Sequence, residues 1–262
     1  MCLMKKFTAV ITLFFCVALG VSARPAAAQD KVTLTVFAAA SMQATMEQIA
    51  ALYTKANPDV EFLYNFDSSG TLKTQIEEGA ECDLFISAAQ KQMNALEKAG
   101  LIDAATRINL LENKVALVVP EGNPAGIHSY EDLGTDKLRA IALGNADVPV
   151  GAYSQEILTN MGLWDKLNAE SRISFGSNVT EVALQVREGA VDCGIVYATD
   201  AATHRLAVVA EPPAGTLKTP VVYPAAVLAH SARAAGARAF LDYLRSPEAL
   251  EIFASVGFAP AK

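Results

Sequence analysis

The stretch Thr35-Val-Phe-Ala-Ala-Ala-Ser-Met42 decides how the rest of the chain is interpreted. Residues 31–37 are rich in valine, threonine and phenylalanine and alternate in polarity, which is typical of a β-strand. Three alanines follow, and Ser41 then opens a run with helical periodicity, so we predict that Ser41 caps a helix. Unpaired N–H groups and the positive end of the helix dipole meet at such a position, where they can bind an anion. A serine that only caps its helix is the alternative interpretation.

The same order of strand, small-residue loop and helix recurs three more times along the chain. The second loop carries Ser68 and Ser69, either of which is expected to cap the helix over 71–78. The third loop covers residues 145–151 and the fourth residues 176–179, each followed by a helical pattern. Strands that alternate with helices predict an α/β fold with mostly parallel sheets flanked by helices.

Two longer apolar strands, Lys114–Val119 and Val221–Leu228, are predicted to cross between two domains. We expect domain I to comprise residues 29–113 plus 222–262, and domain II residues 114–221. Ligands of open α/β sheets bind beyond the carboxyl ends of the strands. Two such domains facing each other therefore predict a cleft between them, with the crossing strands as its hinge.

The predicted ligand contacts at this cleft are uncharged. They are Ser41, Ser69, Val150, Val179 and Tyr197. Hydroxyls and backbone amides supply hydrogen-bond donors but no base that titrates near neutral pH. Such a site suits a fully ionised tetrahedral oxyanion and suits catalysis poorly, so we expect a binding protein and not an enzyme.

The first 28 residues are predicted to be a secretory signal peptide. Lys5 and Lys6 precede an apolar run over 7–21, and Ala26–Ala28 supplies small residues for cleavage, with Met1 or Met4 as the start. Cleavage after Ala28 removes three positive charges and no acid, so the formal net charge changes from −7 to −10. So acidic a chain is not expected to bind nucleic acid or an anionic membrane non-specifically.

The cysteines and histidines carry no ligand spacing typical of a metal site. Cys82 and Cys193 each stand at the start of an apolar strand, in different predicted domains and away from the cleft. We therefore predict two free, buried thiols instead of a disulfide. The three histidines are far apart in the sequence, which argues against a structural zinc site.

Three segments resemble the periplasmic molybdate-binding proteins of ABC transporters, and the similarity extends over essentially the whole mature chain. These segments are Thr35-Val-Phe-Ala-Ala-Ala-Ser41, Asp83-Leu-Phe-Ile-Ser-Ala88 and Gly194-Ile-Val-Tyr-Ala-Thr-Asp200. Two residues depart from the family pattern: Val150, where alanine is common, and the acidic Asp67 near Ser69.

The resemblance implies the two-domain periplasmic binding protein fold and a monomer that delivers molybdate or tungstate to a membrane permease. It implies that the hydroxyls of Ser41, Ser69 and Tyr197 and the amides of Val150 and Val179 contact the oxyanion's oxygens and not the metal directly. No cofactor is implied beyond the ligand itself.

Other functions stay open at this point. A sulfate, phosphate or ferric-ion binding protein has the same general organisation. A serine hydrolase would need a nucleophile elbow, and Ala40-Ser-Met42 does not match Gly-x-Ser-x-Gly. Tyr197 is also explained by simple core packing.

Overall fold

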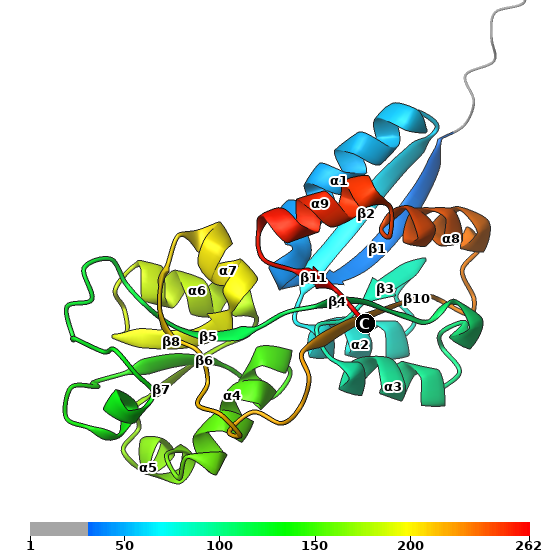
Figure 1. The fold of residues 1–262 in the computed structure, drawn as a ribbon. Helices are drawn as coiled ribbons and strands as arrows, with labels where there is room; N and C mark the ends of the chain where they lie inside the picture. The colour runs from blue at the N-terminus through cyan, green and yellow to red at the C-terminus, as the bar shows by residue number, and fades with distance from the viewer. Residues whose placement is uncertain (1–30) are drawn as a thin grey trace, which may run out of the picture. The chain divides into compact units, whose positions relative to one another are not determined.

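Two β-sheets organise residues 31–262, the part of the chain that the computed structural model describes (Figure 1). These residues form one compact unit. The predicted signal peptide lies outside the described residues. The fold class predicted from the sequence, α/β with two sheets flanked by helices, is confirmed.

The first sheet has the strand order β11-β4-β10-β3-β1-β2. Its strands are β1 (Val32–Ala39), β2 (Val60–Asp67), β3 (Leu84–Ile86), β4 (Ile108–Glu112), β10 (Val222–Val227) and β11 (Ala259–Pro260). β1 pairs in parallel with β2 and β3, whereas β10 and β11 pair antiparallel with their neighbours.

The second sheet has the order β7-β6-β8-β5-β9. Its strands are β5 (Val115–Val119), β6 (Ile141–Gly144), β7 (Ile173–Gly176), β8 (Cys193–Tyr197) and β9 (Ala207–Ala210). β6 pairs in parallel with β7 and β8, whereas β5 pairs antiparallel with β8 and β9. The sheets are therefore mixed and not mostly parallel, because the crossing strands and the unpredicted β4, β9 and β11 run antiparallel.

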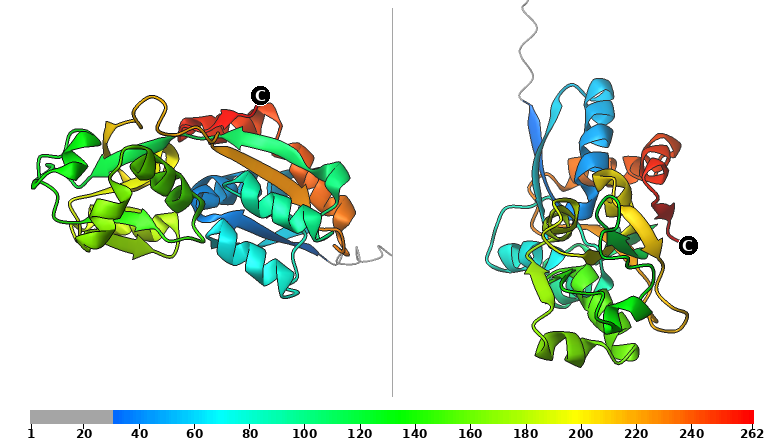
Figure 2. Two further views of the ribbon diagram at one scale, coloured as in Figure 1. Left: turned by 90° about the horizontal axis from the view of Figure 1, so that it is seen from below. Right: turned by 90° about the vertical axis from the view of Figure 1, so that its left-hand side faces the viewer.

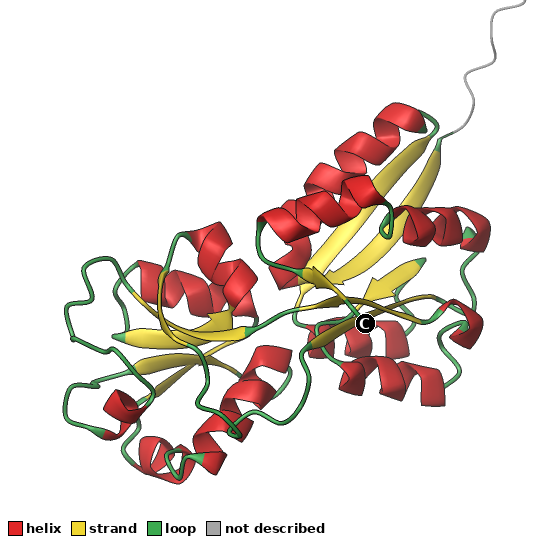
Figure 3. Cartoon of the chain, in the orientation of Figure 1, coloured by secondary structure: helices red, strands yellow, loops and turns green. Residues whose placement is uncertain are grey.

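Helices cover both faces of each sheet (Figure 3). They are α1 (Gln43–Ala56), α2 (Ser69–Glu77), α3 (Gln90–Lys98), α4 (Pro149–Asn160), α5 (Trp164–Ala169), α6 (Val179–Arg187), α7 (Ala198–His204), α8 (Ala234–Tyr243) and α9 (Pro247–Ser255), with short 3₁₀ turns η1 (Ala40–Met42), η2 (Ala104–Thr106) and η3 (Glu131–Gly134). Successive strand residues face opposite sides of a sheet, so Val36 packs toward α1 whereas Phe37 joins the cluster under α2 and α3. None of the described helices is long and apolar enough to cross a membrane.

The chain passes from the first sheet to the second between Glu112 and Val115, and it returns between Ala210 and Val222 (Figure 2). The strands predicted to cross thus belong to one sheet each, and each crossing lies just before its strand. Positions 113/114 and 221/222, where the sequence predicts domain boundaries, lie within these two passages, and the division into two domains stays a prediction.

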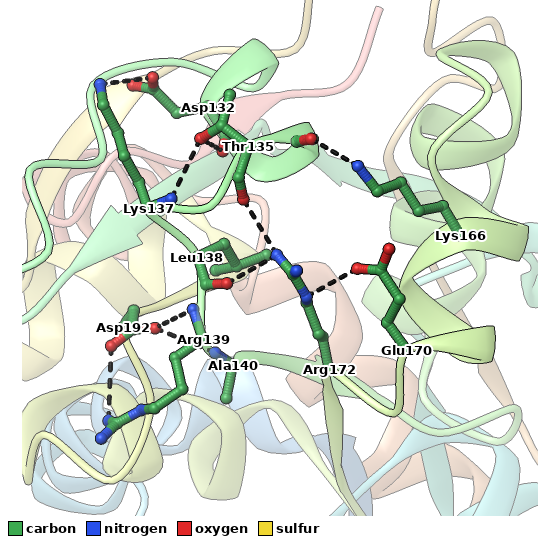
Figure 4. Close-up of polar contacts among 11 residues, drawn as sticks. Asp132, Thr135, Lys137, Leu138, Arg139, Ala140, Lys166, Glu170, Arg172 and Asp192 are labelled. Atoms are coloured by element: carbon green, nitrogen blue, oxygen red, sulfur yellow. Dashed lines mark hydrogen bonds and ion pairs between the residues drawn. The ribbon is translucent and has the colours of Figure 1, made fainter.

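An aspartate ties together the amino-terminal ends of strands in each sheet. The Asp83 carboxylate accepts a hydrogen bond from Thr35 N at 2.8 Å. Asp192 accepts from Arg139 N at 2.6 Å and from Ala140 N at 2.9 Å (Figure 4). These bonds link neighbouring strands on the side of each sheet opposite the carboxyl ends of its parallel strands.

Cys82 and Cys193, the two cysteines among residues 31–262, are each adjacent to one of these aspartates, and both are buried and free. Cys82 precedes β3 and Cys193 begins β8, in different sheets. Burial raises the pKa of the Cys82 thiol to about 12 and that of Cys193 further still. The prediction of two buried thiols at strand starts is confirmed.

Candidate functional site

A small cavity lies at the carboxyl ends of the parallel strands of both sheets. In the first sheet these strands have the order β3-β1-β2, and in the second sheet β8-β6-β7. The cavity offers about 10 Å³ to the centre of a water-sized sphere, close to the least that holds one water. Its lining residues are Ala39, Ala40, Ser41, Asp67, Ser68, Ser69, Ala88, Val148, Pro149, Val179 and Tyr197.

Ser41 lines the cavity, but it does not cap a helix as predicted. It lies inside the 3₁₀ turn Ala40–Met42, and α1 begins only at Gln43, without a side-chain cap. Instead, the Ser41 hydroxyl forms a 2.9 Å hydrogen bond with the hydroxyl of Tyr223 in β10. The serine is thus held by the sheet, and the capping prediction fails because a tertiary partner takes the side chain.

Ser69 is the first residue of α2, and Ser68 is the N-cap, whose Oγ accepts from Thr71 N at 3.1 Å. The Ser69 Oγ accepts a 2.9 Å hydrogen bond from the amide of Ala88, just after β3. Because that bond uses an acceptor position, the Ser69 O–H remains available to donate. The side chain is fully buried and lines the cavity.

The second sheet contributes helix starts. α4 begins at Pro149 and α6 at Val179, so the amides of Val150 and Val179 are among the first N–H groups of their helices, which lack a partner within the helix. The Asn178 side chain caps α6 by accepting from Glu181 N at 3.0 Å. Val179 lines the cavity, whereas at α4 Val148 and Pro149 form the wall and Val150 follows directly behind them.

Tyr197 ends β8 and reaches the cavity from the second sheet. Its hydroxyl lies 3.5 Å from the carbonyl oxygen of Ala88, the residue whose amide donates to Ser69. Burial raises the pKa of Tyr197 well above its usual value, so the phenol keeps its proton and acts as a donor. The structure thus brings four of the five predicted residues to one cavity, with Val150 one residue behind its wall.

Direct contacts between the two sides of the cavity were not predicted from the sequence. The Gly70 amide donates to the carbonyl oxygen of Asp147 at 3.0 Å. The Asn178 side-chain amide lies 3.4 Å from Asp67 Oδ1, which also accepts from the Ser68 amide at 2.7 Å. A glycine beside two serines was the only sequence signal for the first contact.

The chemistry of the wall excludes several kinds of site. None of its residues is a histidine, lysine or arginine. Among residues 31–262, no group of histidine, cysteine or acidic side chains is placed to hold a metal ion. The wall is therefore a set of hydroxyl and amide donors with one carboxylate at Asp67.

A larger cavity, about 330 Å³, lies near the amino-terminal ends of the first sheet's strands and includes Cys82, Asp83 and Arg233. Its carboxylate is already engaged, because Asp83 accepts from the Thr35 amide and from Ser231 Oγ at 2.6 Å. Ligands of open α/β sheets bind beyond the carboxyl ends of the strands, at the opposite end from this cavity, so we assign the site to the smaller cavity.

Comparisons with known proteins agree with this geometry. A family model described as "Bacterial extracellular solute-binding protein" matches residues 34–259. The chain is 38% identical to the molybdate-binding protein ModA of Haemophilus influenzae over 98% of this chain and 99% of that protein. It is 37% identical to ModA of Escherichia coli, over 95% and 97% respectively. The solved periplasmic molybdate-binding protein of Azotobacter vinelandii superposes with a TM-score of 0.78 at 27% identity, covering 87% of this chain and 100% of that one.

The matched residues include both sheets and every element that surrounds the cavity. The chain belongs to the family of bacterial extracellular solute-binding proteins.

Proposed function

We propose that this protein binds molybdate, and tungstate equally, in the cavity between its two sheets. It would do so in the periplasm and deliver the anion to the membrane permease of an ABC transporter. The observation that carries the proposal is the convergence of donors from both sheets on one small cavity. The names of the relatives that match almost the whole chain support the same ligand.

The predicted contacts have the chemistry that a tetrahedral dianion needs. The hydroxyls of Ser41, Ser69 and Tyr197 and the amides of Val150 and Val179 all donate, and each bond to a charged oxygen is worth roughly 1.5–3 kcal/mol. The Asp67 carboxylate would repel an anion, but its Oδ1 already accepts from Ser68 and faces Asn178.

The alternatives fit less well. A ferric ion needs anionic oxygen ligands, whereas the wall offers one carboxylate, at Asp67, and otherwise neutral hydroxyls and amides. A serine hydrolase needs a base beside its nucleophile, whereas the hydroxyl of Ser41 contacts Tyr223 and no histidine lines the cavity. Sulfate and phosphate are the closer rivals, because they share the tetrahedral shape.

Size is the property by which the site would separate molybdate from sulfate, because both are tetrahedral dianions. The cavity as it stands holds about one water, so the two sides must separate to admit either anion, and donors that then fit the longer bonds of molybdate leave the smaller sulfate short of some partners. If sulfate misses two of the contacts, its affinity falls by roughly a hundredfold or more at ~1.5–3 kcal/mol per missed bond. Because no lysine or arginine lines the cavity, we also expect binding to depend weakly on salt.

Titration of the purified protein with a panel of oxyanions tests the proposal. Intrinsic fluorescence from Trp164 and the tyrosines, or calorimetry, reports binding. We expect molybdate to bind, equimolar tungstate to displace it, and a large excess of sulfate or phosphate to fail. Displacement by sulfate on even terms would assign the protein to sulfate or phosphate instead.

A further inference from the structure

The hydroxyl of Tyr223 lies beside Ser41 without lining the cavity, and the Tyr223 ring packs edge-on against Tyr197 of the second sheet, with 5.6 Å between the ring centroids. Tyr223 is fully buried in β10, and its hydroxyl oxygen is 2.9 Å from Ser41 Oγ. Either oxygen of such a pair can be the donor. The direction of the proton between them decides whether Ser41 presents a donor or an acceptor to the cavity.

Asn113, at the first passage between the sheets, biases this direction. Its Oδ1 accepts from the amide of Lys114 at 2.8 Å, which fixes the orientation of the side-chain amide. The Nδ2 therefore donates its two hydrogens to Thr199 Oγ1 at 2.9 Å and to the hydroxyl oxygen of Tyr223 at 3.1 Å. Because Tyr223 already accepts from Asn113, this arrangement favours donation of its own proton to Ser41, whose Oγ lies 2.9 Å away.

We propose that Tyr223, oriented by Asn113, is a positioning residue that makes Ser41 a donor toward the bound anion. The Ser41 Oγ accepts from Tyr223, and its own O–H is then free to donate only into the cavity. This inference rests on the proposed function. Neither positioning residue lines the cavity, and Asn113 and Tyr223 are separated by 110 residues in the sequence.

Ser69 is polarised in the same sense by a different group. Its Oγ accepts from the amide of Ala88, which cannot reverse its direction, so its O–H also donates into the cavity. Ser41 and Ser69 therefore both point a hydrogen into the cavity. A protonated ligand oxygen also carries a hydrogen and needs an acceptor, so it cannot form a hydrogen bond with either serine in this direction. The chain of hydrogen bonds from Asn113 through Tyr223 to Ser41, called the relay below, consequently selects fully deprotonated oxyanions over protonated ones, independently of their size.

Selenate and arsenate test this selection. They are close in size, and at mildly alkaline pH both are dianions, but arsenate retains one proton. Each is used to displace molybdate from the full-length mature protein, and the ratio of the two apparent affinities is compared between variants. A purely structural effect of a substitution weakens both anions together and leaves this ratio unchanged.

The substitution Tyr223→Phe keeps the ring and removes the donor. We expect molybdate to bind about 3- to 10-fold more weakly, in line with the loss of one neutral hydrogen bond, and the preference for selenate over arsenate to shrink. Tyr153→Phe is the matched control, because its buried hydroxyl contacts the carbonyl oxygen of Pro220 at 3.4 Å and no site residue. The control should leave both quantities unchanged.

Asn113→Asp tests the direction of the Tyr223–Ser41 hydrogen bond. The substitution replaces the Asn113 Nδ2, which donates to Tyr223, with a carboxylate oxygen, which can only accept. Tyr223 would then donate to the new carboxylate and accept from Ser41, so Ser41 would turn an acceptor toward the cavity. We expect molybdate affinity to fall about 10- to 150-fold, as for one lost charge-assisted bond. The added charge acts on both dianions alike, so a shift of the selenate-to-arsenate ratio toward arsenate reports the reversal.

The outcomes separate the two proposals. If the wild-type protein fails to bind molybdate, the proposed function falls and the relay with it. If wild type binds molybdate but Tyr223→Phe and Asn113→Asp leave the ratio unchanged, or if arsenate displaces molybdate in no variant, the relay is wrong while the function stands.

Discussion

Gly70 is the residue at which one added methyl group should separate the two sides of the cavity. Its amide donates to the carbonyl oxygen of Asp147 at 3.0 Å across the cavity rim. A Cβ built on Gly70 would lie 2.4 Å from that oxygen and 2.8 Å from the Asp147 Cα. Both neighbours are backbone atoms, so neither can rotate away, and the rims must move apart in Gly70→Ala.

The size of the effect follows from these distances. Ordinary contact begins near 3.4 Å, so the two backbones must separate by about 1 Å, and the 3.0 Å hydrogen bond lengthens to roughly 4 Å, beyond bonding range. Losing this bond costs about 1 kcal/mol, and displacing one donor from the anion costs a further ~1.5–3 kcal/mol. The sum, about 2.5–4 kcal/mol, corresponds to roughly 70- to 1,000-fold weaker binding.

Calorimetric titration with molybdate measures the loss, and thermal unfolding without ligand shows whether the fold is intact. Gly70 lies in the first turn of α2 without a positive φ, so alanine suits the helix itself, and we expect the unliganded protein to lose no more than the roughly 1 kcal/mol of the bond to Asp147. Gly236→Ala in α8 is the control, because its Cβ would meet only the flexible end of Leu34 at 3.3 Å. Binding by Gly70→Ala within about threefold of wild type would refute the reasoning, since a loss that small is well under 1 kcal/mol.

Three further measurements test individual residues. In calorimetry, Ser69→Ala should weaken molybdate binding by roughly 10- to 150-fold, because it removes a hydroxyl donor. Val150→Ala should be near neutral, because the donor there is a backbone amide that the substitution keeps. Equal losses in the two variants would contradict a site in which hydroxyls and backbone amides both bind the anion. Burial raises the pKa of Asp200 to about 8, and its unfolded value is about 4, so the folded state holds a proton that the unfolded state releases. Stability should therefore fall as pH rises from about 4 to 8 and level off above, and Asp200→Asn should flatten this slope in denaturant unfolding; an unchanged slope would show that Asp200 is charged in the fold. Mass spectrometry under denaturing, non-reducing conditions should find Cys82 and Cys193 as two thiols, and a monomer lighter by two hydrogens would contradict their burial in separate sheets.

The parts of the fold that could be predicted are those determined by residues close together in the sequence. Pro149 at the first position of α4 and the serine at position 68 are local signals, and the structure uses both as helix starts. The parallel strands followed from their apolar patterns. β4, β9 and β11 were missed because they are short and are defined by the strands that they pair with, which a local pattern does not contain.

Most of the predicted site residues line the cavity, but the sequence did not predict the residues that hydrogen-bond to them from outside the cavity. A serine after small residues indicates a helix start, and this placed Ser41 correctly at the cavity but with the wrong partner. Its actual partner, Tyr223, lies 182 residues away, and only the antiparallel insertion of β10 beside β3 brings it close. Contacts between residues so far apart in the sequence depend on the order of strands in the sheet, so they cannot be predicted from the spacing of residues.

The matching orders β3-β1-β2 and β8-β6-β7 make the two walls of the cavity equivalent halves. The middle strand of each trio leads to Ser41 or Val150, and the outer strand to Ser69 or Val179. The two walls are thus equivalent in topology, and each supplies one donor position after its middle strand and one after its outer strand. A tetrahedral anion can present two oxygens to each wall. Under the proposed function a planar anion with three oxygens, such as nitrate, leaves one wall with a single oxygen, so we expect it to bind more weakly.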